Sequence, residues 1–131
     1  MRPLLLLAVL LLAPGCNRWA ILATDGQPKD GATELVLGER AQAYIYGTHN
    51  GFETQPFRCS SDDTIVSSDP SILSVRRTGG FKEIDVNAYD VDAPVFDLES
   101  HRLGEVELRT DCGGEEATVK IRVVASCCAN P

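Results

Sequence analysis

The residues best suited to chemistry in this sequence are its cysteines and a cluster of oxygen-bearing side chains. The chain has 131 residues and five cysteines, namely Cys16 near the N-terminus, Cys59, Cys112, and the adjacent pair Cys127 and Cys128. A thiol can be acylated, oxidised to a disulfide, or deprotonated to bind a metal. Which of these happens depends on the compartment and on the elements that position each cysteine.

The segment 85–99 is the best candidate for a metal site. Ca²⁺ prefers about six to eight oxygen ligands, and this segment is the richest in such oxygens. Residues 90–96 within it are similar to the calcium-binding linker of cadherins, although EF-hand spacing is absent. We expect a solvated loop in an acidic insertion at 89–103, with calcium as the alternative and no other cofactor. The candidate ligands are Asp85, Asn87, Asp90, Asp92, Asp97 and Glu99.

The sequence contains no recognisable catalytic motif. His49 and His101 belong to no HExxH pattern or zinc spacing, and the nucleophile elbow, P-loop and dinucleotide fingerprint are absent. We therefore predict that the protein is not an enzyme. Tyr44 and Tyr46 alternate with apolar residues and are predicted to project together from an outer sheet face. They would form either an aromatic pair that stabilises the sheet or part of a binding patch.

The N-terminus is typical of an exported protein. Residues 4–13 are entirely apolar but too few for a membrane-spanning helix, which needs about 20 residues. Residues 12–16, Leu-Ala-Pro-Gly-Cys, resemble the lipobox of bacterial lipoproteins. That resemblance implies a signal peptide over residues 1–15 that is cleaved off, and a Cys16 whose acyl chains hold the protein in a membrane.

The same resemblance implies a location in the bacterial cell envelope. Asn17 differs from the aspartate that retains lipoproteins in the inner membrane, which favours the outer membrane. The net charge is −7, and loss of Arg2 with the signal peptide makes it −8, which disfavours nucleic-acid binding. In an oxidising compartment, the four cysteines after Cys16 are expected to form disulfides.

Later in the chain, apolar residues alternate with polar ones, which is typical of half-buried strands. Residues 105–109 and 118–123 each place Val, Leu or Ile on one face and charges or threonine on the other. Gly113 and Gly114 lie between them and can supply the positive φ angles of a hairpin turn. This pattern predicts an all-β, antiparallel sandwich.

The chain is accordingly divided into four parts. The signal peptide at 1–15 is followed by a lipidated N-terminus and linker at 16–33, the sandwich at 34–126, and a tail at 127–131. Turn residues dominate the predicted linker, but its apolar stretch at 19–23 makes an early strand the alternative.

Residues 64–75 carry a family resemblance. Their sequence, Thr-Ile-Val-Ser-Ser-Asp-Pro-Ser-Ile-Leu-Ser-Val, resembles a strand–turn–strand segment of bacterial Ig-like domains of group 2, the invasin and intimin type. Residues 35–39 are similar to the opening strand of that family, and residues 104–108 with 117–124 to its closing hairpin. The resemblance implies an Ig-like sandwich without catalytic residues. This chain differs in having a single copy and four cysteines after Cys16.

Hairpin geometry favours one disulfide. If the glycine pair forms the turn, Cys112 lies at the hairpin tip. Each further residue of a strand moves the chain about 3.3 Å from that tip, so Cys127 lies far from Cys112. A disulfide needs Cα atoms within about 7 Å, so we predict a bond between Cys59 and Cys112. A bond from Cys59 to Cys127 or Cys128 is the alternative. With the first pairing, the two terminal cysteines bond to each other, stay reduced, or bridge to another molecule.

These features favour a noncatalytic, lipid-anchored module of the cell envelope. Its predicted partners are the membrane, through the lipid, and an envelope protein or surface glycan. Two alternatives stay open: a periplasmic lipoprotein that binds calcium or a small ligand through residues 85–99, and an enzyme inhibitor on a β scaffold. Fold by itself does not decide among them.

Overall fold

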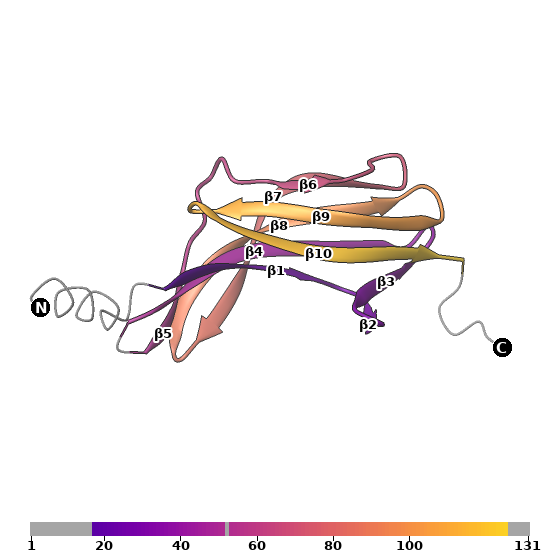
Figure 1. Cartoon of the computed structure of the whole chain (residues 1–131). Helices are drawn as coiled ribbons and strands as arrows, with labels where there is room; N and C mark the ends of the chain where they lie inside the picture. Colours follow the sequence, from indigo (N-terminus) through magenta and orange to yellow (C-terminus); the bar gives the residue numbers. More distant parts are fainter. Residues whose placement is uncertain (1–16, 52, 126–131) are drawn as a thin grey trace, which may run out of the picture.

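The computed structural model describes residues 17–51 and 53–125, which form ten strands in two sheets packed face to face (Figure 1). This arrangement confirms the predicted all-β, Ig-like sandwich. The predicted signal peptide, Cys16 and the Cys127–Cys128 pair lie outside the described residues. None of the described residues forms a helix of the length and apolarity that a membrane crossing requires. The strands are β1 (Arg18–Thr24), β2 (Gln27–Lys29), β3 (Ala32–Val36), β4 (Arg40–Asn50), β5 (Thr54–Phe57), β6 (Ile65–Ser67), β7 (Leu73–Val86), β8 (Tyr89–Ser100), β9 (Gly104–Cys112) and β10 (Glu115–Val124).

The two sheets differ in strand direction. The first contains β1, β4, β8 and β7 in that order, with β5 also paired to β4, and all its pairs are antiparallel. The second has the order β2, β3, β10, β9 and β6, and within it β3 and β10 run parallel. The predicted antiparallel sandwich therefore has one parallel pair among its described strands. β3 and β10 lie far apart in the chain, so no hairpin turn imposes opposite directions on them.

Alternation along the strands fills the space between the sheets with apolar side chains. In β4 the inward residues Ala41, Ala43 and Ile45 are buried, and the residues between them face outward. Phe96 of β8 is completely buried and is the largest such side chain. Removing this apolar surface from water is the main favourable term in folding.

The β9–β10 hairpin forms where the sequence predicts it. Cys112 pairs with Glu115 across the tip, and between them Gly113 and Gly114 have φ angles of 63° and 92°. Residues with a Cβ are strained at such angles, so the glycine pair allows the tight turn. The prediction of this hairpin is confirmed.

The linker predicted over residues 16–33 is wrong, because most of this segment belongs to the sandwich. β1 pairs with β4 over all seven of its residues, which confirms the alternative of an early strand at 19–23. The turn residues connect successive short strands, and Gly26, Asp30 and Gly31 all have positive φ angles. Closely spaced turn signals therefore mark turns between strands here, not a flexible spacer.

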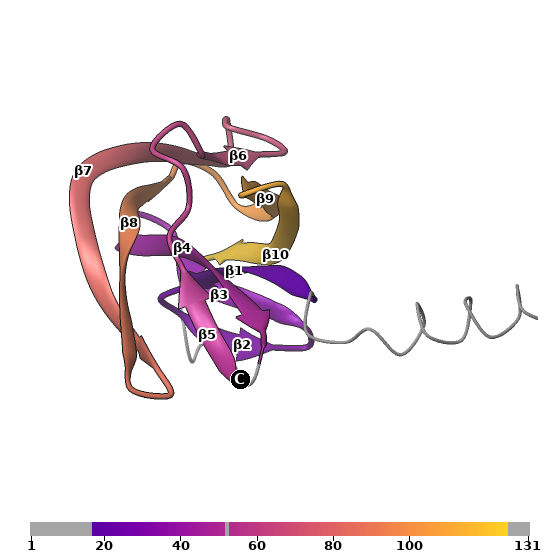
Figure 2. The same ribbon diagram turned by 90° about the vertical axis from the view of Figure 1, so that its left-hand side faces the viewer.

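The loop predicted in the acidic insertion at 89–103 is also wrong. β8 spans most of this segment and pairs with β7 in a long hairpin that bends around the side of the sandwich (Figure 2). Phe96 and Leu98 of β8 are buried in the core, while Asp97 and Glu99 alternate with them on the outer face. Although the segment is acidic, its buried and exposed residues alternate with a period of two, which is characteristic of a strand.

Candidate functional site

The six calcium candidates do not gather around one point. Their carboxylates are spread along the β7–β8 hairpin: Asp85 pairs with Asp90 near the tip, and Asp92, Asp97 and Glu99 follow along β8. At about 3.3 Å per residue, Asp97 lies roughly 23 Å from Asp90. Among the described residues, no three carboxylates of this hairpin come close enough together to share an ion.

Two of these candidates have partners within the sheet instead. Asp97 accepts hydrogen bonds from Arg76 at 2.6 Å and from the Gln42 side chain at 3.2 Å, and so links β4, β8 and β7. Asn87 occupies the hairpin turn with a φ of 53°, and its amide donates to the Thr54 carbonyl at 2.7 Å. Both residues therefore have structural roles.

Cys59 and Cys112 form a disulfide, which confirms the predicted pairing (S–S 2.05 Å, Cα–Cα 4.9 Å). Both cysteines are buried, and Asp63 lies beside them. The Asp63 carboxylate accepts hydrogen bonds from the backbone N–H groups of Ser60 at 2.8 Å and Gly113 at 3.2 Å. A metal would need thiolates, and a disulfide offers none. Residues 58–64 form the crossover that connects β5 in the first sheet to β6 in the second. The disulfide and Asp63 therefore fasten this crossover to the β9–β10 turn.

Tyr44 and Tyr46 lie on one outer face of β4, as predicted. Their rings stack with centroids 6.4 Å apart and 12° between the planes, and the Lys82 ammonium lies 4.8 Å from the Tyr44 centroid. Burial raises the pKa of Tyr46, and the neighbouring Tyr44 raises it further, because both disfavour a phenolate. These contacts explain the pair as packing between β4 and β7.

Three residues on β7, β8 and the following turn have the side chains of a Ser-His-Glu triad. Ser74 Oγ lies 2.8 Å from His101 Nε2, and His101 Nδ1 lies 3.7 Å from a Glu99 carboxylate oxygen. The second distance exceeds a hydrogen bond, and the Glu99 side chain is 74% exposed, so it does not fix the imidazole. Sequence patterns did not reveal this trio, since only the strand register places Ser74 opposite Glu99.

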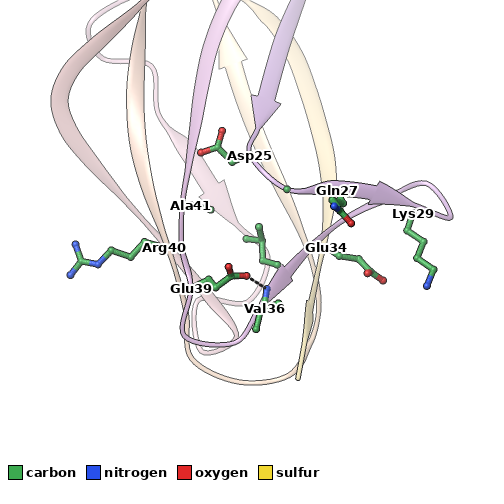
Figure 3. Close-up of a pocket in the computed structure, with 10 residues that line it drawn as sticks. Asp25, Gln27, Lys29, Glu34, Val36, Glu39, Arg40 and Ala41 are labelled. Carbon is green, nitrogen blue, oxygen red and sulfur yellow. Dashed lines mark hydrogen bonds between the residues drawn. The ribbon is translucent and has the colours of Figure 1, made fainter. Parts of the chain in front are cut away.

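A recess of about 400 Å³ opens at one end of the sandwich, lined by residues of β2, β3 and the start of β4 (Figure 3). Two of its carboxylates are already engaged. Asp25 accepts from a backbone N–H of β4 at 3.2 Å, and Glu39 from one of β3 at 3.1 Å. The side chains of Lys29 and Arg40 extend away from each other in Figure 3. The recess therefore lacks the convergent polar groups of a catalytic pocket.

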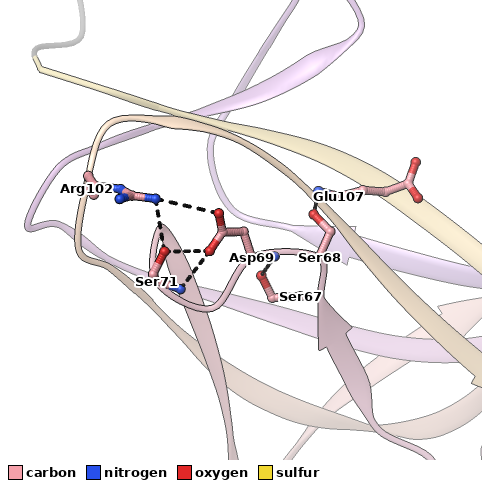
Figure 4. Close-up of polar contacts among 6 residues, drawn as sticks. All are labelled: Ser67, Ser68, Asp69, Ser71, Arg102 and Glu107. Atoms are coloured by element: carbon pink, nitrogen blue, oxygen red, sulfur yellow. Dashed lines mark hydrogen bonds and ion pairs between the residues drawn. The ribbon is translucent and has the colours of Figure 1, made fainter.

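The Ser-Ser-Asp-Pro-Ser turn between β6 and β7 forms a polar network (Figure 4). The Asp69 carboxylate accepts from the Ser71 N–H at 3.0 Å and hydroxyl at 2.5 Å, and lies 3.6 Å from the Arg102 guanidinium. The Ser68 N–H donates to the Glu107 carbonyl, and its hydroxyl oxygen accepts from the Glu107 N–H, both at 2.9 Å. This motif anchors β7 and β9 and has a structural role.

We expect Asp69 to stabilise the fold in a pH-dependent way. The Ser71 hydroxyl holds the pKa of Asp69 below its usual value of 3.8, and the Ser71 backbone N–H and Arg102 act in the same direction. Stabilisation by a group with a depressed folded pKa is present above its unfolded pKa and is lost as pH falls through the folded pKa. Urea unfolding of the parent and Asp69→Asn proteins should therefore give a stability difference that is constant above about pH 5 and shrinks below 3.8.

The matched control for this experiment is Asp62→Asn, an exposed carboxylate outside the network. We expect the control to show a smaller difference from the parent at every pH. A difference for Asp69→Asn that stays constant down to about pH 2.5 would contradict the assigned role of the charge.

Comparison with known proteins supports the fold but identifies no family. No family model matches the chain, and no curated protein matches it. Among solved structures, the chain is similar to part of the S-layer protein rSbsC(31–844), with a TM-score of 0.55 and 13% sequence identity. The match covers 85% of this chain but only 14% of that one. At this identity the similarity shows the fold alone, and the resemblance to group 2 bacterial Ig-like domains stays a prediction.

Proposed function

We propose that the protein is a noncatalytic, lipid-anchored module of the bacterial cell envelope. The apolar run at residues 4–13, the small residues after it, and Cys16 support the anchor. A small sandwich with a disulfide between Cys59 and Cys112 is compatible with an oxidising compartment outside the cytoplasm.

The observation that carries the proposal is how closely the folded domain follows Cys16. β1 begins at Arg18, and the carbonyl of Asn17 already accepts a hydrogen bond from the Asn50 N–H at 3.0 Å. Acyl chains on Cys16 would therefore join the sandwich almost directly. Without a spacer, the end of the sandwich at which β1 starts would lie against the membrane (Figure 1).

That geometry would point the other end of the sandwich away from the membrane. β1 spans seven residues, about 23 Å, and the recess of Figure 3 lies beyond its far end at Asp25. We infer that this end and its loops meet the partner, which is another envelope protein or a surface glycan.

The anchor is tested by Cys16→Ser in a bacterium that processes lipoproteins. We expect the parent protein in the membrane fraction, with an N-terminal peptide whose mass includes a diacylglyceryl group, and the variant in the soluble fraction. Cys127→Ser is the matched control, because it removes a thiol but keeps the lipid, and it should stay with the membrane. An unmodified N-terminal peptide in the parent would refute the anchor.

The absence of catalysis is tested at Ser74, the residue most similar to an activated nucleophile. A fluorophosphonate probe reacts covalently with a serine that a fixed base activates. Because Glu99 does not orient His101, we expect no labelling of Ser74 under native conditions. Labelling that disappears in His101→Ala would show that the protein is a hydrolase and would overturn the noncatalytic part of the proposal.

A further inference from the structure

We propose that the protein binds a small anionic ligand, carrying a carboxylate or phosphate group, between Arg58 and Arg77. A cavity of about 370 Å³ lies between the crossover that follows β5 and the bulged part of the β7–β8 hairpin. Both arginines line it, together with Phe81 and Pro94. This site goes beyond the envelope role proposed above and does not depend on the lipid.

The charges at this cavity are unusual for so acidic a protein. The chain has a net charge of −7, and four of its arginines, at 76, 102, 109 and 122, each lie within 4.0 Å of a carboxylate oxygen. Arg58 and Arg77, like Arg18 and Arg40, have no such ion pair among residues 17–51 and 53–125, but only Arg58 and Arg77 line this cavity together. Two guanidiniums without counterions on one cavity favour an oxyanion, which can accept two parallel hydrogen bonds from each.

The Arg77 guanidinium is held in place before any ligand arrives, and the Arg58 guanidinium lies against an aromatic ring. Arg77 lies over the ring of the buried Phe96, 5.1 Å from its centroid, and donates to the backbone carbonyl of Asp63. Arg58 lies 5.0 Å from the centroid of the Phe81 ring. Long side chains that are fixed in this way lose less entropy when they bind a ligand, which increases affinity.

Phe81 gives the cavity an apolar wall. Phe81 is 54% exposed, and the register of β7 against β8 shifts between Arg77 and Phe81. Within this bulge Gly79 has a φ of 84°, and the Thr78 hydroxyl donates to the Val95 carbonyl at 2.8 Å. Bulges commonly redirect a side chain, and here the bulge leaves an aromatic ring open beside two cations. The site therefore suits an anionic group on a compact ring.

A matched set of sugars tests this proposal on the purified protein. Glucose, glucuronate and glucose 6-phosphate share one ring and differ in the group at carbon 6, and inorganic phosphate supplies the anion alone. We expect saturable NMR shifts at the Arg58 and Arg77 side-chain N–H groups with the anionic probes at millimolar concentration, and none with glucose. A response to glucuronate only identifies a carboxylate ligand, and a response to the two phosphates only identifies a phosphate ligand.

Three variants locate the binding. Arg58→Gln with Arg77→Gln should weaken it roughly ten-fold or more, because each lost charged hydrogen bond costs about that much. Arg109→Gln, which removes one positive charge on β9 away from the cavity, should leave binding unchanged. Phe81→Ala should weaken the anionic sugars more than inorganic phosphate. Circular dichroism confirms that each variant is folded. Binding that survives in the double variant, an equal response to glucose, or no saturable shift would overturn the proposal.

Discussion

We expect the double variant Cys59→Ala, Cys112→Ala to lose about 4 kcal/mol of unfolding free energy. The disulfide closes a span of 53 residues, and opening it restores chain entropy to the unfolded state. It also joins the crossover between the sheets to the tip of the β9–β10 hairpin, where Asp63 makes its two backbone contacts. Guanidinium unfolding of the parent and the variant measures the difference directly.

The control for this experiment is the parent protein after addition of a mild reductant. Because Cys59 and Cys112 are 5% and 0% exposed, we expect the bond to survive under native conditions and to open only on unfolding. A loss below about 1 kcal/mol in the alanine variant would show that the crossover is held mainly by its hydrogen bonds. Amide exchange at Ser60 then reports which of the two contributions dominates.

Phe96→Ala is expected to destabilise the protein by about 3–5 kcal/mol. Phe96 is fully buried between the sheets, so truncation removes apolar contacts and leaves a cavity that the strands fill only in part. It also removes the ring on which Arg77 lies. Since small domains are stable by only about 5–15 kcal/mol, this substitution takes a large share of the total.

Phe81→Ala is the matched control, since it makes the same chemical change on an exposed ring. We expect it to cost less than about 1 kcal/mol, because surface substitutions rarely cost more. Phe96→Leu keeps most of the volume and guards against a variant that does not fold. Equal losses for Phe96→Ala and Phe81→Ala would contradict the placement of Phe96 at the centre of the core.

Local sequence predicted the elements whose signals lie within a few residues of each other. Alternation along β9 and β10 together with Gly113 and Gly114 predicted a hairpin whose register the structure reproduces. From that hairpin, strand spacing disfavoured a bond between Cys112 and the terminal cysteines and so favoured Cys59 as the partner. Each inference needed only backbone preferences and distances along the chain.

In two segments the amino-acid composition predicts a linker or loop, but the structure has strands. Residues 16–33 are rich in turn signals and were predicted as a linker, but these signals are the corners of β1, β2 and β3. Residues 89–103 are rich in carboxylates and were predicted as a loop, but Phe96 and Leu98 alternate with those carboxylates. In both cases a partner strand from elsewhere in the chain satisfies the backbone hydrogen bonds of the segment.

Some candidate sites could likewise be predicted from local sequence, whereas others form only when distant strands meet. Strand alternation correctly placed Tyr44 and Tyr46 on one outer face. The cavity between Arg58 and Arg77 left no local signal, because one arginine follows β5 and the other lies on β7. Ser74 and His101 likewise meet only through the pairing of β7 with β8.

The amino-acid sequence by itself determined the all-β class, the closing hairpin and its most plausible disulfide, and it carries the signal-peptide pattern on which the proposed anchor rests. Only the tertiary structure decided that β3 runs parallel to β10, that residues 18–24 form a strand of the sandwich, and which charges meet at a cavity. The reason is physical. Backbone preference and side-chain alternation are set by near neighbours, whereas the pairing of distant strands depends on many weak contacts that no short segment contains.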